Sequence, residues 1–138
     1  MDKAFIDTNV FVYANDTADL GKQDAAIALV KGALRDGWGV VSTQVVMEYA
    51  AVASTRLGQS RDAVTRQTYA MERLEVVSVS PELIRTGLEF AEQYQLSFWD
   101  GVILAAAHAA RCTIIWSEDF TPGRRYAGII VKTPFEAL

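Results

Sequence analysis

Residues 3–9 read KAFIDTN, a short apolar run that ends abruptly at Asp7. A short apolar run bounded by polar turn residues is typical of a buried strand, so we predict a first strand over 3–7 and a short helical turn over 10–14. In parallel α/β sheets the ligand crevice lies at the carboxyl ends of the strands. The end of this strand is therefore a candidate functional site, and Asp7 is its first candidate residue.

Short apolar runs continue to alternate with helical stretches along the chain. Four further strands are predicted over 39–42, 75–79, 113–116 and 128–131, with helices over 21–35, 44–57, 61–74, 81–94 and 98–111. Strands of this kind indicate a sheet covered by helices on both faces. We predict a single α/β domain over residues 1–138, a three-layer α/β/α sandwich around a mostly parallel five-stranded sheet. Ser-Glu-Asp at 117–119 ends the fourth strand and should lie at the same rim as Asp7.

The composition sets bounds on the class of protein. Hydrophobic residues make up 51% of the 138 residues and charged residues 22%, as in an ordinary globular domain. Cys112 is the single cysteine, and neither a signal peptide nor a run of about 18 apolar residues is apparent, so we expect a cytoplasmic chain with no membrane association. The net charge of −4 argues against nucleic-acid binding through bulk positive charge.

Three acidic residues are each the only charged residue in a long apolar segment. They are Asp7 between Lys3 and Asp16, Glu48 between Asp36 and Arg56, and Asp100 between Glu92 and Arg111, with His108 counted as neutral. A desolvated carboxylate must find a cation or take up a proton. Hard divalent cations such as Mg²⁺ and Mn²⁺ prefer oxygen ligands. The three isolated acids therefore predict a metal site, to which Asp119 adds a fourth candidate.

Each acid also has an ordinary structural explanation. Asp7 would cap the helical turn that follows the first strand, and Glu48 would be a solvated helix position. Asp100 completes the capping-box pattern SFWD at 97–100 and suits the first turn of a helix. Asp119 would be a turn residue. One shared site is a more economical explanation than four separate coincidences.

Four segments of the chain stand in the order and spacing of one known family. They are FIDTN at 5–9, VME at 46–48, DGVILAAA at 100–107 and IIWSEDF at 114–120. Together they resemble a PIN domain, and most of all the VapC-type toxins of prokaryotic toxin–antitoxin systems. The resemblance extends over residues 3–131. Two departures are that Gly101 stands where alanine is common and that Trp99 replaces a more variable residue.

The resemblance implies a metal-dependent ribonuclease. By position, Asp7, Glu48 and Asp100 match the three core acids of the family, and Asp119 matches a fourth, more variable one. These four would hold one or two Mg²⁺ or Mn²⁺ ions, which would lower the pKa of a water and stabilise charge on the scissile phosphate. Their charge equals the net charge of −4, since the remaining acids and the bases both number 13.

Three polar residues, Thr8, Asn9 and Ser117, match positions that support the site through hydrogen bonds. Glu118 competes with Asp119 for the fourth acidic position, and we assign Asp119 because it lies two positions after a Ser/Thr. The resemblance also implies an RNA substrate, a homodimer and a small antitoxin protein as partner. The helix over 98–110 is apolar nearly all round, which is compatible with a homodimer.

Other functions compete with this interpretation. A haloacid-dehalogenase-like phosphatase needs a second Asp two positions after Asp7, where this chain has Asn9. A receiver-like regulatory domain needs an Asp at the end of the third strand, and 75–79 contains none. A PIN-like domain that acts as an RNA-processing nuclease, as a metal-dependent phosphatase or purely as a scaffold stays open. Arg124 and Arg125 are candidate RNA phosphate contacts, or simply solvated residues of a loop.

Overall fold

The computed structural model describes residues 2–135, which form six strands and six helices. The strands are β1 (Ala4–Ile6), β2 (Gly39–Ser42), β3 (Glu75–Val77), β4 (Ile114–Trp116), β5 (Arg125–Tyr126) and β6 (Ile129–Lys132). The helices are α1 (Thr8–Ala14), α2 (Leu20–Asp36), α3 (Thr43–Ser54), α4 (Arg61–Met71), α5 (Pro81–Tyr94) and α6 (Phe98–Ala109). Every predicted strand and helix is present, with ends shifted by a few residues.

The strands form one sheet in the order β3-β2-β1-β4-β6-β5. All neighbours pair in parallel except β5, which is antiparallel to β6. The sheet thus has six strands rather than the predicted five. The additional strand, β5, is only two residues long, which is too short to produce a hydrophobic pattern in the sequence. It is joined to β6 by Ala127 and Gly128, which both have positive φ, at 51° and 80°, as a tight hairpin turn requires.

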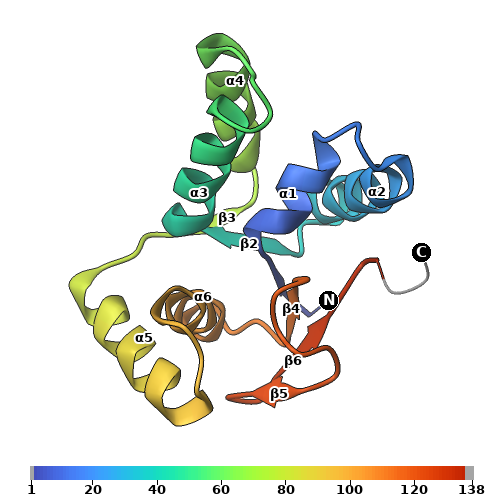
Figure 1. The fold of residues 1–138 in the computed structure, drawn as a ribbon. Helices are drawn as coiled ribbons and strands as arrows, with labels where there is room; N and C mark the ends of the chain where they lie inside the picture. Colours follow the sequence, from blue (N-terminus) through green and yellow to red (C-terminus); the bar gives the residue numbers. More distant parts are fainter. Residues whose placement is uncertain (1, 136–138) are drawn as a thin grey trace.

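Helices cover both faces of the sheet, as the three-layer prediction requires. Figure 1 shows α1 and α2 on one side, α5 and α6 on the other, and α3 and α4 projecting together from the body. The central strands are continuous apolar runs because both of their faces are covered. Phe5, Val40, Ile115 and Val131 are fully buried. None of the helices within residues 2–135 is long and apolar enough to cross a membrane.

Helix α6 passes through the interior of the domain. Every residue from Gly101 to Ala107 is buried, and α6 packs closely on α5 where two glycines meet. A Cβ at Gly101 would overlap the carbonyl oxygen of Gly87 and lie 2.9 Å from the Cβ of Ala91. This contact explains why glycine replaces the alanine expected at position 101. Packing within one chain also accounts for the apolar circumference of α6, so this helix is no argument for a homodimer.

Candidate active site

The site lies where the order of the strands reverses. β1 has β2 on one side and β4 on the other, and such a reversal opens a crevice at the carboxyl ends of the strands. The backbone N–H of Asp7, after β1, donates to the carbonyl of Trp116, the last residue of β4, at 3.0 Å. Asp7 and the segment 117–119 therefore meet at this rim, as the sequence predicted.

Asp7 has two structural roles at once. It is the N-cap of α1, where its Oδ1 accepts from the backbone N–H of Thr8 at 2.7 Å. Its Oδ2 accepts from the hydroxyl of Ser117 at 2.7 Å. The side chain is only 3% exposed. The capping explanation for Asp7 is therefore correct, but it leaves the carboxylate buried at the centre of a polar cluster.

Ser117 connects the elements around Asp7. Besides donating to Asp7, its hydroxyl oxygen accepts from Nδ2 of Asn9 at 3.4 Å and from the backbone N–H of Asp119 at 3.0 Å. The Oδ1 of Asn9 accepts from the backbone N–H of Glu118 at 3.4 Å. These bonds fix the loop after β4 against the first turn of α1.

Glu48 reaches the same rim from α3. Its Oε2 accepts from the hydroxyl of Thr8 at 2.7 Å, and its Oε1 accepts from Nε2 of Gln44 at 2.9 Å. The Gln44 amide also donates to the backbone carbonyl of Trp99 at 3.2 Å, so it connects α3 with the start of α6. Sequence reasoning missed Gln44, although its position one helical turn before Glu48 was a usable signal.

Asp100 lies in the first turn of α6, which begins with a capping interaction. The hydroxyl of Ser97 accepts from the backbone N–H of Asp100 at 3.1 Å. Burial raises the pKa of the Asp100 carboxyl, and the negative charges of Asp119 and Glu48 raise it further, against a hydrogen bond from Ser97 that lowers it. Asp119 and Glu48 are therefore close enough to Asp100 for their charges to act on it.

The surroundings of Asp7 raise the pKa of its carboxyl. Burial raises the pKa of Asp7 to about 7 from a usual 3.8, and the negative charges of Asp119 and Asp100 add to the rise. The hydrogen bonds from Ser117 and Thr8 oppose it. A buried carboxylate beside two others needs either a proton or a cation at neutral pH.

The donor set suits a hard divalent cation. The four acids and the nearby hydroxyls offer oxygen ligands alone, which is the preference of Mg²⁺ and Mn²⁺. Within residues 2–135, no group of three or more His, Cys, Asp or Glu side chains lies close enough together to hold a metal ion as the side chains stand. The fit therefore rests on the chemistry of the donors and on the buried charge of Asp7.

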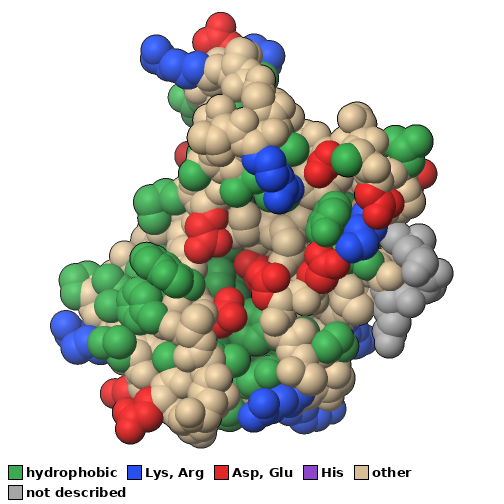
Figure 2. Space-filling view, in the orientation of Figure 1, with side chains coloured by type: hydrophobic (Ala, Val, Ile, Leu, Met, Phe, Trp, Pro, Cys, Tyr) green, Lys and Arg blue, Asp and Glu red, His purple; other side chains and the backbone are tan. Residues whose placement is uncertain are grey.

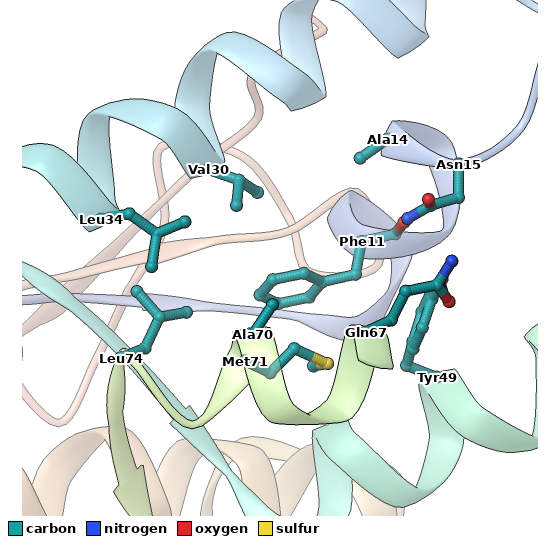
Figure 3. Close-up of a pocket in the computed structure, with 10 residues that line it drawn as sticks. All are labelled: Phe11, Ala14, Asn15, Val30, Leu34, Tyr49, Gln67, Ala70, Met71 and Leu74. Carbon is teal, nitrogen blue, oxygen red and sulfur yellow. Dashed lines mark hydrogen bonds between the residues drawn. The ribbon is translucent and has the colours of Figure 1, made fainter. Parts of the chain in front are cut away.

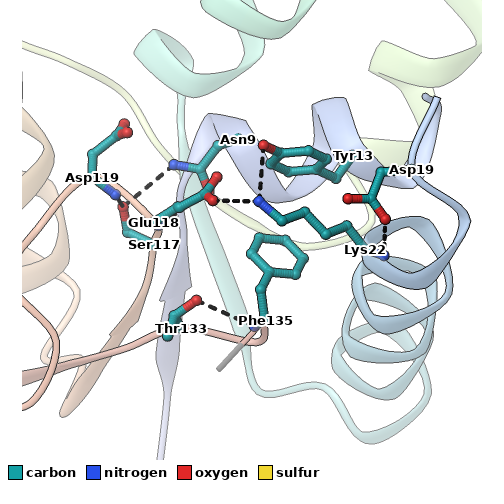
Figure 4. A network of polar contacts seen from close by, with 9 residues as sticks. All are labelled: Asn9, Tyr13, Asp19, Lys22, Ser117, Glu118, Asp119, Thr133 and Phe135. Atoms are coloured by element: carbon teal, nitrogen blue, oxygen red, sulfur yellow. Dashed lines mark hydrogen bonds and ion pairs between the residues drawn. The ribbon is translucent and has the colours of Figure 1, made fainter. Parts of the chain in front are cut away.

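The two acids of the loop after β4 point in different directions (Figure 4). Oε1 of Glu118 accepts from Nζ of Lys22 on α2 at 2.6 Å, and the same ammonium donates to the hydroxyl of Tyr13 at 3.2 Å. Asp119 points away from this pair and acts electrostatically on Asp7 and Asp100. This geometry favours Asp119 as the fourth acid.

An open cleft of about 550 Å³ lies beside the acids. Its lining consists of Thr8, Asn9, Val12, Tyr13, Glu48, Ala51, Val52, Arg56, Glu118 and Asp119. Figure 2 shows acidic side chains gathered around this hollow. Local sequence does not distinguish Arg56 from the other arginines of the chain, so its presence in the cleft is a finding of the structure.

Arg124 and Arg125 do not line this cleft. Both are exposed, Arg125 belongs to β5 rather than to a loop, and the Arg124 guanidinium lies 4.8 Å from the centre of the Tyr126 ring. His108 is also exposed and packs edge-on against Phe90.

Burial of Asp7 should make the stability of the metal-free protein depend on pH. Its folded-state pKa is raised, so the stabilisation from its proton is fully present below about pH 3.8 and is lost as the pH rises through about 7. We expect unfolding in urea and EDTA to require about 2.5 kcal/mol less free energy at pH 8 than at pH 5. Asp7→Asn should remove this difference. If the unfolding free energy of Asp7→Asn depended on pH as that of the wild type does, Asp7 would not be the group responsible.

Comparison with known proteins agrees with this architecture. The family model of the PIN domain matches residues 4–126, whereas no curated protein sequence matches the chain. A toxin–antitoxin complex from Klebsiella pneumoniae superposes with a TM-score of 0.68 at 20% identity, covering 97% of this chain and 99% of that one. VapC20 of Mycobacterium tuberculosis, described as a sarcin-ricin loop cleaving toxin, gives a TM-score of 0.68 at 16% identity over 93% and 99%. VapBC2 of Rickettsia felis, bound to a DNA fragment from its promoter, gives a TM-score of 0.64 at 18% identity over 94% and 97%. With the family model matching most of its length, the chain belongs to the PIN domain family.

Proposed function

We propose that this protein is a metal-dependent endoribonuclease and the toxin of a toxin–antitoxin pair. The observation that carries the proposal is that four isolated acids from four separate segments, Asp7, Glu48, Asp100 and Asp119, lie at one rim of the sheet, where burial and neighbouring charges raise the pKa of Asp7 and of Asp100. Hydrolysis of a phosphodiester needs charge stabilisation at the phosphate and an activated water. A cluster of acids with no paired cysteine or histidine nucleophile suits this chemistry.

Asp7, Glu48 and Asp100 would be ligands of Mg²⁺ or Mn²⁺, and Asp119 a ligand or a group that positions water. The bound ion would activate the attacking water and offset negative charge on the phosphate. The chain's own contribution is orientation, since Ser117 and Thr8 hold the carboxylates of Asp7 and Glu48 at 2.7 Å each.

The choice of substrate distinguishes a ribonuclease from the competing phosphatase function. We expect the protein to cleave a labelled single-stranded RNA in Mn²⁺, to lose this activity in EDTA and to leave p-nitrophenyl phosphate intact. Turnover of p-nitrophenyl phosphate without RNA cleavage would favour a phosphatase, and inactivity on both would favour a scaffold.

The two loop acids should differ in their effect on cleavage. Asp119→Asn is expected to slow RNA cleavage by about a hundredfold because it removes charge from the acid cluster. The matched variant Glu118→Gln removes only a partly exposed ion pair with Lys22 and should leave the rate within about threefold. Single-turnover rates of both variants measure this contrast. The reverse order of effects would make Glu118 the fourth acid.

A small antitoxin is the proposed protein partner. The similar structures include toxin–antitoxin complexes, and the chain has an apolar cavity of about 130 Å³ between α1, α2, α3 and α4 (Figure 3). Its lining includes Phe11, Leu34 and Met71. The product of a short neighbouring reading frame should co-purify with this chain and inhibit RNA cleavage. Ala70→Glu, an exposed position at the cavity, should weaken that inhibition.

A homodimer and a cytoplasmic location complete the proposal. Ile84 and Leu88 on α5 are 38% and 53% exposed, and an apolar surface of this kind suits a contact with a second copy. Sedimentation of the protein at micromolar concentration tests the dimer. An RNA substrate is consistent with a cytoplasmic protein.

Arg124 and Arg125 stay candidates for phosphate contacts outside the cleft. If they contact RNA, Arg124→Ala and Arg125→Ala will each reduce the slope of log Kd against log salt concentration by about one. Unchanged slopes would exclude both residues as phosphate contacts.

A further inference from the structure

A large aromatic side chain lies exposed in the helical turn that carries Asp100. Trp99 precedes Asp100 in the first turn of α6 and is 62% exposed, although the residues that follow it from Gly101 to Ala107 are buried. The indole packs only partly against its own chain, with the Phe98 ring edge-on at a centroid distance of 5.0 Å. The core therefore does not account for a tryptophan at this position.

The backbone that carries Trp99 is fixed relative to two of the acids. Its carbonyl accepts from Nε2 of Gln44 at 3.2 Å, and the same amide donates to Glu48 at 2.9 Å. Ser97 caps the turn, and Gly101 is pressed against α5. The exposed ring is therefore mounted on a rigid turn next to the site, as a stacking platform requires.

Two of the acids each follow an exposed hydrophobic residue in the sequence. Met47 precedes Glu48 in the same way that Trp99 precedes Asp100, and it is 64% exposed. Figure 2 shows exposed hydrophobic side chains directly beside the acidic ones. Arg56 is the one basic residue in the lining of the cleft within the described part of the chain. A nucleic acid would thus gain little from charge at this site and must gain affinity in another way.

We propose that Trp99 stacks on an unpaired nucleobase of the RNA strand, beside the phosphate that is cleaved. The inference rests on the proposed function. Aromatic side chains bind bases of any sequence through their faces, and one such stack contributes about tenfold or more to affinity. Since a paired base has both faces covered, the substrate would be single-stranded or looped RNA at this point.

The test compares Trp99→Ala, Trp99→Phe and a matched control, Tyr69→Ala. Tyr69 is 66% exposed and lies on α4, which carries none of the four acids. For single-stranded RNA, Trp99→Ala should raise KM by about tenfold with kcat within about twofold. Trp99→Phe should recover most of the loss, and Tyr69→Ala should behave as the wild type. Because stacking involves no counterion release, the slope of log KM against log salt concentration should not change.

Intrinsic fluorescence separates this inference from the proposed function. RNA binding should quench the wild-type emission, and Trp99→Phe, which keeps Trp38 and Trp116, should lose the quenching. Quenching without RNA cleavage would contradict the proposed ribonuclease function and still support stacking by Trp99. RNA cleavage by Trp99→Ala with an unchanged KM would contradict the stacking proposal alone. A higher KM that coincides with dissociation of a dimer in sedimentation would also overturn it, since Trp99 would then contact a second copy.

Discussion

Asp7→Asn is expected to slow metal-dependent RNA cleavage by about a thousandfold or more. The substitution keeps the size of the side chain and removes its charge from the most buried of the four acids, which is 3% exposed. An amide is a poor ligand for Mg²⁺ or Mn²⁺ in a site that otherwise gathers carboxylates. Single-turnover cleavage of a labelled single-stranded RNA measures the effect.

The control for this prediction is the same substitution at Asp24, an exposed residue of α2. Asp24→Asn should cleave at the wild-type rate. Thermal unfolding separates lost chemistry from lost structure, because Asp7→Asn removes a buried charge and should unfold at a higher temperature than wild type in EDTA at pH 8. Cleavage by Asp7→Asn within about threefold of wild type would contradict the role of Asp7.

Gly101→Ala is expected to destabilise the protein by about 3 kcal/mol. The added methyl group would meet the carbonyl oxygen of Gly87 and the side chain of Ala91, so α5 and α6 would have to separate. Because Asp100 precedes this position, the rate of RNA cleavage should fall as well. Urea unfolding followed by circular dichroism gives the change in stability.

Gly32→Ala is the matched control for Gly101→Ala. Gly32 also lies inside a helix, α2, but the nearest atoms to an added Cβ are 3.9 Å away. Alanine favours helices more than glycine does, so this variant should gain about 0.5 to 1 kcal/mol. If Gly101→Ala were as stable as wild type, the close contact between α5 and α6 would be wrong.

Much of the fold follows from local sequence. KAFIDTN at 3–9 and the other buried strands are short apolar runs, and Ser42, Ser60, Ser80 and Ser97 each cap a helix, a position that serine favours. The meeting of Asp7 with 117–119 follows from the rule that parallel strands end at a common rim. β5 could not be predicted, because two residues carry no periodicity.

The remaining details of the site depend on contacts between distant residues. The pairing of Lys22 with Glu118, 96 positions apart, has no local signal, yet it distinguishes Glu118 from Asp119. Arg56 enters the cleft only because α3 ends beside it. These contacts arise from the packing of helices onto the sheet, which a single sequence does not specify.

The net negative charge of the chain also has a physical explanation. The net charge of −4 argues against nucleic-acid binding through bulk positive charge, but four of the acids lie at one rim. A divalent cation bound there would offset this charge locally. RNA binding should therefore depend first on the metal and only weakly on a basic surface.

The most direct test of the central claim is a titration with Mn²⁺ in which metal binding, by calorimetry, and RNA cleavage are followed on the same protein. The account predicts that the cleavage rate of the wild type rises in proportion to bound Mn²⁺ and that Asp7→Asn loses both binding and cleavage. Cleavage that persists in EDTA, or binding of Mn²⁺ undiminished in Asp7→Asn, would contradict it.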